Sequence, residues 1–134
     1  MEQTLVLIKP DAVERGLVGR IITRFEDKNL QIAALKQLQL SRKMAEKHYK
    51  EHREKPFYGK LIAHITSGPV IAMIVRGPEA VKTVRCLIGD TAGTIPGTIR
   101  GDWADSVTYN LVHGSDSPES AAREMNLFFP KMEL

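Results

Sequence analysis

The apolar residues of this chain follow two patterns, short continuous runs and longer runs with helical spacing. Continuous apolar runs at Leu5–Ile8 and Val70–Val75 predict buried strands. We predict two further strands, at about residues 31–40 and 110–113. Apolar side chains that recur every three or four residues predict amphipathic helices after residue 16, after residue 41, and at about residues 57–65, 78–88 and 118–129.

The predicted elements form the order strand, helix, strand, helical hairpin, strand, helix, strand, helix. Four strands divided between two β-α-β halves favour an α+β sandwich of the ferredoxin-like type (β-α-β-β-α-β), in which helices cover a four-stranded antiparallel sheet. No repeat, low-complexity segment or linker interrupts the 134 residues. We therefore expect one domain over residues 1–134, which is long enough to bury a core without disulfides or metals.

One segment, residues 89–101, fits neither pattern. It is rich in glycine and threonine, which predicts irregular structure, and it is too long to be only a connection between two elements. Loops of this kind usually carry function.

Composition narrows the class of protein. The content of 43% hydrophobic and 26% charged residues is that of an ordinary globular domain. The formal charge of +3 and the pI of about 9.1 favour an anionic ligand, but no long basic run predicts a dedicated nucleic-acid surface. We expect no membrane segment, because no apolar run approaches the ~18 residues that a membrane helix needs. A single cysteine, Cys86, suits a cytoplasmic location.

The last predicted strand delivers a histidine, His113, to the start of the last helix. Ser117 and Pro118 mark that start, because serine caps unpaired N–H groups and proline is favoured at the first helical position. A helix N-terminus attracts anions, and Gly114 would let a phosphate approach the imidazole closely. We interpret His113 as the reactive group, with the alternative that it is a strand-end histidine bonded to neighbouring backbone.

Other polar residues near predicted strand ends and turns form a set suited to phosphoryl groups: Lys9, Arg85, Thr91, Arg100 and Asn110. Each of them alone is more commonly a solvated surface residue, and spacing does not show that they converge. Asn110 and His113 are three positions apart, which places them on opposite faces of a regular strand. For both to serve one site, the strand must twist, bulge or end between them.

Several of these residues stand in blocks that resemble the nucleoside diphosphate kinase family, and the resemblance runs from Leu5 to about Phe129. The signature of the family's nucleophile is present as Asn110-Leu-Val-His113-Gly-Ser-Asp-Ser. The other similar blocks, in the family's order, are Lys9-Pro10-Asp11, Ser67-Gly68-Pro69 and Pro96-Gly-Thr-Ile-Arg100-Gly-Asp102. The chain is most similar to the short bacterial members.

The resemblance implies the ferredoxin-like sandwich and a defined activity. That activity is transfer of the γ-phosphate of a nucleoside triphosphate to a nucleoside diphosphate, by a ping-pong mechanism through a phosphohistidine, which maintains ribo- and deoxyribonucleoside triphosphate pools. It also implies Mg²⁺ as cofactor and a homo-oligomer, either a tetramer or a hexamer.

The family's catalytic roles fall on matching positions of this sequence. By resemblance, His113 would attack the γ-phosphate, and Glu124, with Ser115 beside it, would fix the other ring nitrogen. Lys9, helped by Tyr49, would hold the transferring phosphate. Histidine suits this role chemically, because its neutral form is nucleophilic and, with a reference pKa near ~6.5, is abundant at pH 7.

The nucleotide-binding roles also come from the resemblance. Arg85, Thr91 and Arg100 would grip the phosphates, and Lys9 with Asn110 would reach the sugar hydroxyls. Phe57 would stack on the base, although its position on an amphipathic helix, taken without the resemblance, favours a core residue. Mg²⁺ would have no direct protein ligand and would ride on phosphate oxygens and water, with Asp116 at most an indirect ligand. The segment from Thr91 to Arg100 is about two residues shorter than the family pattern, which leaves the conformation of this loop open.

Two other functions remain as alternatives. His48-Tyr-Lys-Glu51-His52 matches the H-x-x-E-H pattern of inverted zinc peptidases, in which both histidines share one helical face. A third protein ligand would have to come from elsewhere in the chain. The basic pI is also compatible with a non-enzymatic nucleic-acid-binding module, which would bind polynucleotides in a salt-sensitive way without turning nucleotides over.

Overall fold

The structure, a computed structural model, describes residues 1–106 and 109–130. Its elements follow one another as β1 (Glu2–Ile8), α1 (Pro10–Glu14), α2 (Val18–Glu26), β2 (Gln31–Leu38), α3 (Arg42–His48), the short 3₁₀ helix η1 (Lys50–His52), α4 (Tyr58–Ile65), β3 (Val70–Gly77), α5 (Ala80–Ile88), α6 (Ile99–Trp103), β4 (Val112–Gly114) and α7 (Pro118–Phe128).

The four strands form one antiparallel sheet in the order β2-β3-β1-β4. The central strands β1 and β3 pair over their whole length, from Glu2 opposite Gly77 to Ile8 opposite Ile71. The short strand β4 pairs with the end of β1, so that His113 lies opposite Leu7. The predicted α+β sandwich with a four-stranded antiparallel sheet is therefore confirmed.

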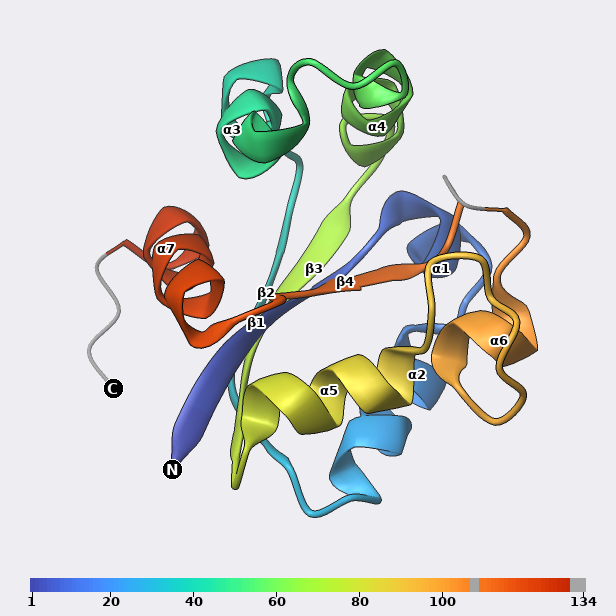
Figure 1. Ribbon diagram of the computed structural model, residues 1–134, viewed down its shortest axis with the longest axis vertical. Coiled ribbons are helices and arrows are strands. Elements are labelled where there is room, and N and C mark those ends of the chain that lie inside the picture. The colour runs from blue at the N-terminus through green and yellow to red at the C-terminus, as the bar shows by residue number, and fades with distance from the viewer. Residues whose placement is uncertain (107–108, 131–134) are drawn as a thin grey trace.

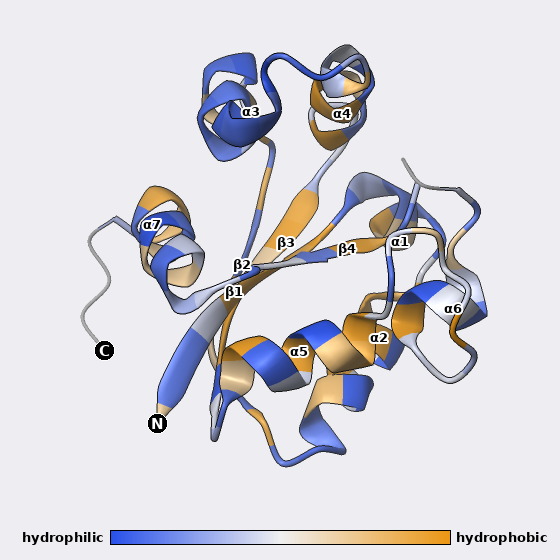
Figure 2. Cartoon of the chain, viewed as in Figure 1, coloured by the Kyte–Doolittle hydropathy of each residue, from blue (hydrophilic) through white to orange (hydrophobic). Residues whose placement is uncertain are grey.

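Helices cover both faces of this sheet (Figure 1). Side chains of a strand alternate between the two faces, and β1 shows this directly, since Val6 and Ile8 pack with α2 and α5 whereas Leu5 and Leu7 pack with α3, α4 and α7. Each face thus has its own apolar core. Strand β3 contributes to both cores and is the most continuously apolar strand in Figure 2, as its sequence predicted.

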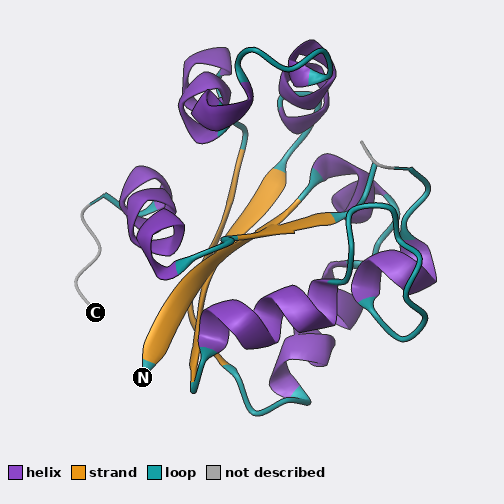
Figure 3. Ribbon diagram, in the orientation of Figure 1, coloured by secondary structure: helices purple, strands orange, loops and turns teal. Residues whose placement is uncertain are grey.

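Two short α-helices were not predicted. Proline was expected only to stop the first strand, but Pro10 also begins α1, where its missing N–H costs no hydrogen bond. The segment predicted to be irregular, residues 89–101, contains the start of α6, because the Thr98 side chain caps it by accepting the N–H of Gly101 at 3.0 Å. The remainder of that segment is the loop between α5 and α6 in Figure 3.

The loop between α5 and α6 is held by its own side chains and by α2. Asp90 accepts the backbone N–H of Thr94 at 2.8 Å and also its hydroxyl. Arg24 of α2 binds Asp102 at 2.8 Å and the carbonyl of Gly97 at 3.0 Å. These contacts hold the loop against α2 and fix its path between α5 and α6.

Among the residues that the structure describes, none of the helices has the length and apolar content that crossing a membrane requires.

Candidate active site

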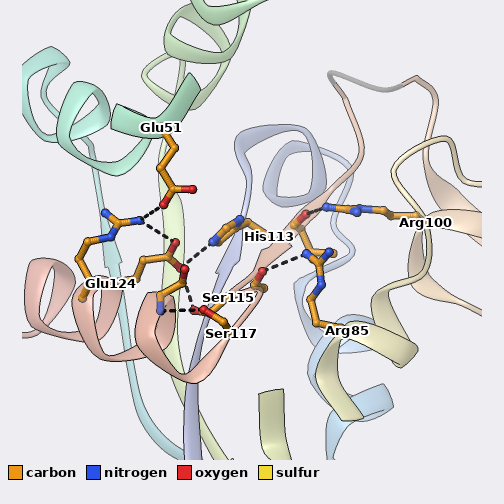
Figure 4. A network of polar contacts seen from close by, with 11 residues as sticks. Glu51, Arg85, Arg100, His113, Ser115, Ser117 and Glu124 are labelled. Carbon is orange, nitrogen blue, oxygen red and sulfur yellow. Dashed lines mark hydrogen bonds and ion pairs between the residues drawn. The ribbon is translucent and has the colours of Figure 1, made fainter. Parts of the chain in front are cut away.

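Most of the predicted site residues line two pockets that share His113, whereas Arg100 and Ser115 line neither pocket. His113 comes from β4 and lies between α7 and α5 (Figure 4). Two pockets, of about 220 Å³ and about 540 Å³, adjoin here. Both are lined by His113 together with Tyr49, His52 and Thr91. A ligand could therefore extend through both pockets while it contacts one imidazole.

The imidazole of His113 is oriented by a carboxylate. Its Nε2 lies 2.8 Å from Oε1 of Glu124, and the same oxygen accepts the hydroxyl of Ser115 at 2.8 Å. Burial would raise the pKa of Glu124, but the hydrogen bond and charge of His113, with the Ser115 hydroxyl, outweigh it and hold the pKa below its ordinary value. Since Nε2 is occupied by this ionised carboxylate, Nδ1 is the ring nitrogen available for chemistry.

The carboxylate of Glu124 has a third neighbour, which sequence analysis did not identify. Arg123 of α7 approaches Oε2 of Glu124 at 3.4 Å and binds Glu51 at 3.1 Å (Figure 4). Adjacent residues on a helix point in different directions, so spacing gave no signal for this contact.

Another histidine that was not assigned to the site packs against the reactive one. The rings of His48 and His113 meet edge to face, with centroids 4.6 Å apart. His48 is buried, and neither of its ring nitrogens has a hydrogen-bond partner among the described residues. Burial, followed by the charges of His113 and Lys9, holds the pKa of His48 well below its ordinary value, so this ring is neutral.

The structure does not support a zinc site at the zinc-peptidase pattern His48-Tyr-Lys-Glu51-His52. Helix α3 ends at His48, and His52 belongs to the separate turn η1, so the two histidines do not share one helical face. In the described part of the chain, the cluster with metal-ligating atoms close together is instead His48, His113 and Glu124, within 4.8 Å of one another. Two imidazoles and one carboxylate are poor ligands for Mg²⁺, which prefers oxygen.

A magnesium ion at this site would therefore be held by the oxygen atoms of a ligand rather than by the His48, His113 and Glu124 cluster. Asp116 is an exposed carboxylate that lines the smaller pocket beside Arg85 and Thr91. A hydrogen bond from Ser120 lowers its pKa, so it is ionised at neutral pH. One carboxylate with room for water suits an ion that keeps most of its hydration shell and binds phosphate oxygens.

Lys9 and Asn110 meet at the larger pocket. Lys9 is almost fully buried, and its ammonium donates to the Asn110 side-chain oxygen at 2.9 Å. Burial, and then the charge of Arg100, lowers the pKa of Lys9 to about 8, against the opposite influence of Asp11. A buried ammonium with a lowered pKa marks a functional cation more often than a structural one.

The structure shows how Asn110 and His113 line one pocket although they lie three positions apart. Strand β4 begins only at Val112, and Leu111 before it has a φ of 76°. The N–H of Val112 donates to the carbonyl of Asn110 at 2.9 Å, which closes a three-residue γ-turn. The boundary of the strand therefore lies between Asn110 and His113, and the turn before β4 directs Asn110 into the pocket.

The two predicted phosphate-binding arginines lie at the border of β4. Arg85 donates to the carbonyl of Gly114 at 3.3 Å. The buried Arg100 donates to the carbonyls of Val112 at 2.8 Å and Gly89 at 3.4 Å, and burial, followed by the charge of Arg85, lowers its pKa to about 10. The Arg100 guanidinium thus remains charged at neutral pH.

Gly114 lines the smaller pocket and also lies against α5. A Cβ atom there would lie 2.8 Å from Ile88 and 3.1 Å from Val84, both on α5. The glycine is needed because β4 packs closely against this helix.

Phe57 and Tyr49 lie on the larger pocket. The Phe57 ring is 44% exposed, which rules out the alternative that it is a core residue. The Lys55 ammonium is 5.6 Å from its centroid. Tyr49 is buried, and burial raises the pKa of its hydroxyl, which therefore stays protonated and can donate.

Comparisons with known proteins agree with this arrangement. The family model "Nucleoside diphosphate kinase" matches residues 2–134. The chain is 61% identical over 131 residues to the nucleoside diphosphate kinase of Rubrobacter xylanophilus, covering 96% of this chain and 98% of that protein. It is 57% identical over 136 residues to that of Archaeoglobus fulgidus, covering 100% of this chain and 90% of that protein.

A solved structure is similarly close. The crystal structure of the Aquifex aeolicus nucleoside diphosphate kinase matches with a TM-score of 0.95 at 39% identity, covering 99% of this chain and 98% of that one. The family model matches nearly the whole sequence, the relatives are more than 50% identical, and the solved structure has the same fold. The chain therefore belongs to the nucleoside diphosphate kinase family.

Proposed function

We propose that this chain transfers the γ-phosphate of a nucleoside triphosphate to a nucleoside diphosphate, with Nδ1 of His113 as the nucleophile. The observation that carries the proposal is the contact between His113 and Glu124, which occupies Nε2 and leaves Nδ1 free between two pockets. Arg85 and Arg123 line the smaller of these pockets and Lys9 lines the larger one, which suits the transfer of a highly charged group.

The reaction has two matching halves. In the first, the Nδ1 lone pair of His113 forms a bond to the γ-phosphorus while the bond from phosphorus to the β,γ-bridging oxygen breaks, and the nucleoside diphosphate leaves. The positive charge that develops on the ring is stabilised by Glu124, which accepts the Nε2 proton in a hydrogen bond. In the second half, a terminal phosphate oxygen of the acceptor diphosphate attacks the phosphohistidine, and His113 leaves as a neutral imidazole.

The nucleotide is held by residues of both pockets and by Arg100, which lines neither of them. Arg85, Thr91 and Arg100 bind its phosphates, and Lys9, with the Tyr49 hydroxyl, binds the transferring group. Arg100 must exchange its main-chain acceptors for phosphate oxygens, so part of its binding energy replaces hydrogen bonds that already exist.

The sugar and the base occupy the larger pocket. Lys9 and Asn110 bind the sugar hydroxyls, and their mutual contact supports the assignment, because it brings a donor and an amide to the same point. Phe57 offers an exposed face on which any base can stack.

Bound Mg²⁺ supplies charge neutralisation on the phosphate oxygens. Asp116 is the residue of this chain that would orient its water ligands. The chain forms a single domain over residues 1–134. Its family resemblance supports a homo-oligomer, either a tetramer or a hexamer, and its single cysteine supports a cytoplasmic location.

The test is retention of phosphate by the protein in the absence of acceptor. Purified protein with γ-labelled ATP and Mg²⁺ should retain label that is stable in alkali and lost in acid, as a phosphohistidine is. His113→Ala should retain none, and Ala63→Ser, on an exposed position of α4, should label like the parent. Absence of label on the parent would contradict the proposal and favour a binding module, and acid-stable label would contradict the phosphohistidine.

A further inference from the structure

The turn that directs Asn110 into the pocket is conformationally strained. Leu111 is fully buried and has a φ of 76°, a region that residues with a side chain rarely adopt. Such backbone persists only where the surrounding structure determines it. The groups that hold Leu111 therefore decide where Asn110 lies.

Both backbone polar groups of Leu111 are bound by the segment that follows β1. Its carbonyl accepts the N–H of Lys9 at 2.8 Å, and its N–H donates to Oδ2 of Asp11 at 3.1 Å. The first of these bonds is made by backbone and survives substitution of side chains. The second depends on where the carboxylate of Asp11 lies, 100 positions away in the sequence.

The position of that carboxylate is fixed in turn by a histidine of α4. Nε2 of His64 lies 3.0 Å from Oδ1 of Asp11, so the two carboxylate oxygens bind two different elements. Both side chains are buried, at 5% and 9% exposure, and the Tyr109 ring packs edge to face on His64 with centroids 4.5 Å apart. Burial would raise the pKa of Asp11, but the hydrogen bond and charge of His64 outweigh it and lower the pKa.

A continuous chain of hydrogen bonds thus runs from α4 to the larger pocket, through His64, Asp11, the Leu111 turn and Asn110, and ends at the Lys9 ammonium. We propose that Asp11 and His64 are positioning residues that clamp the Leu111 turn and thereby aim the Asn110 amide, which accepts from the Lys9 ammonium, at the nucleotide's sugar. Neither residue touches the substrate. The clamp depends on the proposed function in one respect only, which is that the ligand of the larger pocket is a nucleotide.

The clamp should affect nucleotide binding more than chemistry. His113 lies beyond the turn and is placed independently, by the pairing of β4 with Leu7 of β1 and by Glu124. Loosening the turn therefore displaces Asn110, while the nucleophile keeps its environment and Lys9 keeps its main-chain bond to Leu111 at the end of β1. This separation gives the clamp a kinetic signature that a general loss of stability would not produce.

The decisive variants change His64 alone. His64→Phe keeps a ring of similar size but removes the donor to Asp11, whereas His64→Gln keeps an N–H donor that can reach the carboxylate. Ile62→Val is the matched control, because it lies on the same helix, is buried in the core with α3 and α7, and lies outside the clamp. It lowers stability without touching Asp11.

In His64→Phe, we expect KM for nucleoside diphosphates to rise about tenfold, the scale of one lost charge-assisted hydrogen bond, with kcat within about threefold of the parent. His64→Gln should return KM to within about threefold of the parent, and Ile62→Val should leave KM unchanged. Phosphorylation of His113 by phosphoramidate, a small donor with no sugar or base, should proceed at the parent rate in all three variants. An unchanged KM in His64→Phe, or a rise that Ile62→Val reproduces, would overturn the clamp.

A second readout does not depend on enzyme activity. The amide proton of Leu111 should exchange with solvent about tenfold faster in His64→Phe than in the parent, while the amide of Ile74 in the middle of β3 is unaffected beyond the change in global stability. Unchanged exchange at Leu111 would also overturn the clamp. If the parent itself turns no nucleotide over, the proposed function fails, and the exchange measurement still decides whether the clamp exists.

Discussion

The ammonium of Lys9 donates to the side-chain oxygen of Asn110 at 2.9 Å inside the protein, although 101 positions separate the two residues in the sequence. Burial lowers the pKa of this ammonium to about 8. Lys9 is thus charged at neutral pH but loses its proton only slightly above it.

The first prediction is that kcat/KM falls as pH rises through about 8. The lowered pKa belongs to the free enzyme, and kcat/KM reports free-enzyme groups, so each further unit of pH should cost about tenfold in this constant. Lys9→Arg should retain less activity at pH 7 but show no such fall, because a guanidinium stays charged. A parent profile that is flat from pH 7 to 9.5 would exclude Lys9 as a required cation.

The second prediction concerns the carboxylate behind the reactive imidazole. Glu124→Gln should lower kcat about ten- to a hundredfold, because a charged hydrogen bond is worth about 1.5–3 kcal/mol and a neutral amide stabilises the developing ring charge poorly. KM should stay unchanged, since Glu124 is buried behind His113. Ser115→Ala should cost less than tenfold. Steady-state kinetics measure both, and parent-like kcat in Glu124→Gln would show that the contact is only structural.

The third prediction concerns Arg100. Arg100→Ala should lower kcat/KM about ten- to a hundredfold, the value of one lost charge-assisted contact. It should also lower the melting temperature, because the guanidinium binds the carbonyls of Val112 and Gly89. Arg100→Lys should recover less than half of the lost binding free energy, since an ammonium cannot form the same fork. If Arg100→Ala melts earlier but keeps the parent kcat/KM, the shortened loop holds this arginine away from the phosphates.

The fourth prediction concerns the range of substrates. If Phe57 binds the base by stacking, purine and pyrimidine diphosphates, in ribose and deoxyribose forms, should all be phosphorylated, with purines modestly better. Double-reciprocal plots should be parallel, because the donor product leaves before the acceptor enters. Phe57→Ala should raise KM for every base, by the ~1–3 kcal/mol that stacking contributes. A preference above about a thousandfold for one base would require hydrogen-bond recognition of its edge and would contradict stacking.

Much of the fold could be predicted because local sequence determines it. The run Val70–Val75 is apolar throughout since β3 is buried on both faces, and Ser117 with Pro118 begins a helix by capping alone. The short helix α6 was missed because its cap, Thr98, lies in a stretch with too few apolar residues to show a period.

The candidate site was harder to predict where it depends on contacts between distant segments. The identity of His113 and its basic neighbours followed from the sequence, chiefly through family resemblance. The edge-to-face packing of His48 and the turn at Leu111 did not, because the first joins residues 65 positions apart and the second is held by Asp11 and Lys9 from the other end of the chain. Strained backbone is imposed by tertiary contacts and leaves no local pattern.

The close packing at Gly114 makes neighbouring positions depend on one another during evolution. A methyl group at Gly114 meets Ile88 and Val84, so alanine there would push β4, and His113 with it, away from α5 and from Arg85 on that helix. A smaller residue at position 84 would relieve part of that collision. Substitutions at positions 84 and 114 are therefore coupled. The distance between His113 and Arg85 depends on Gly114, a residue that has no side chain.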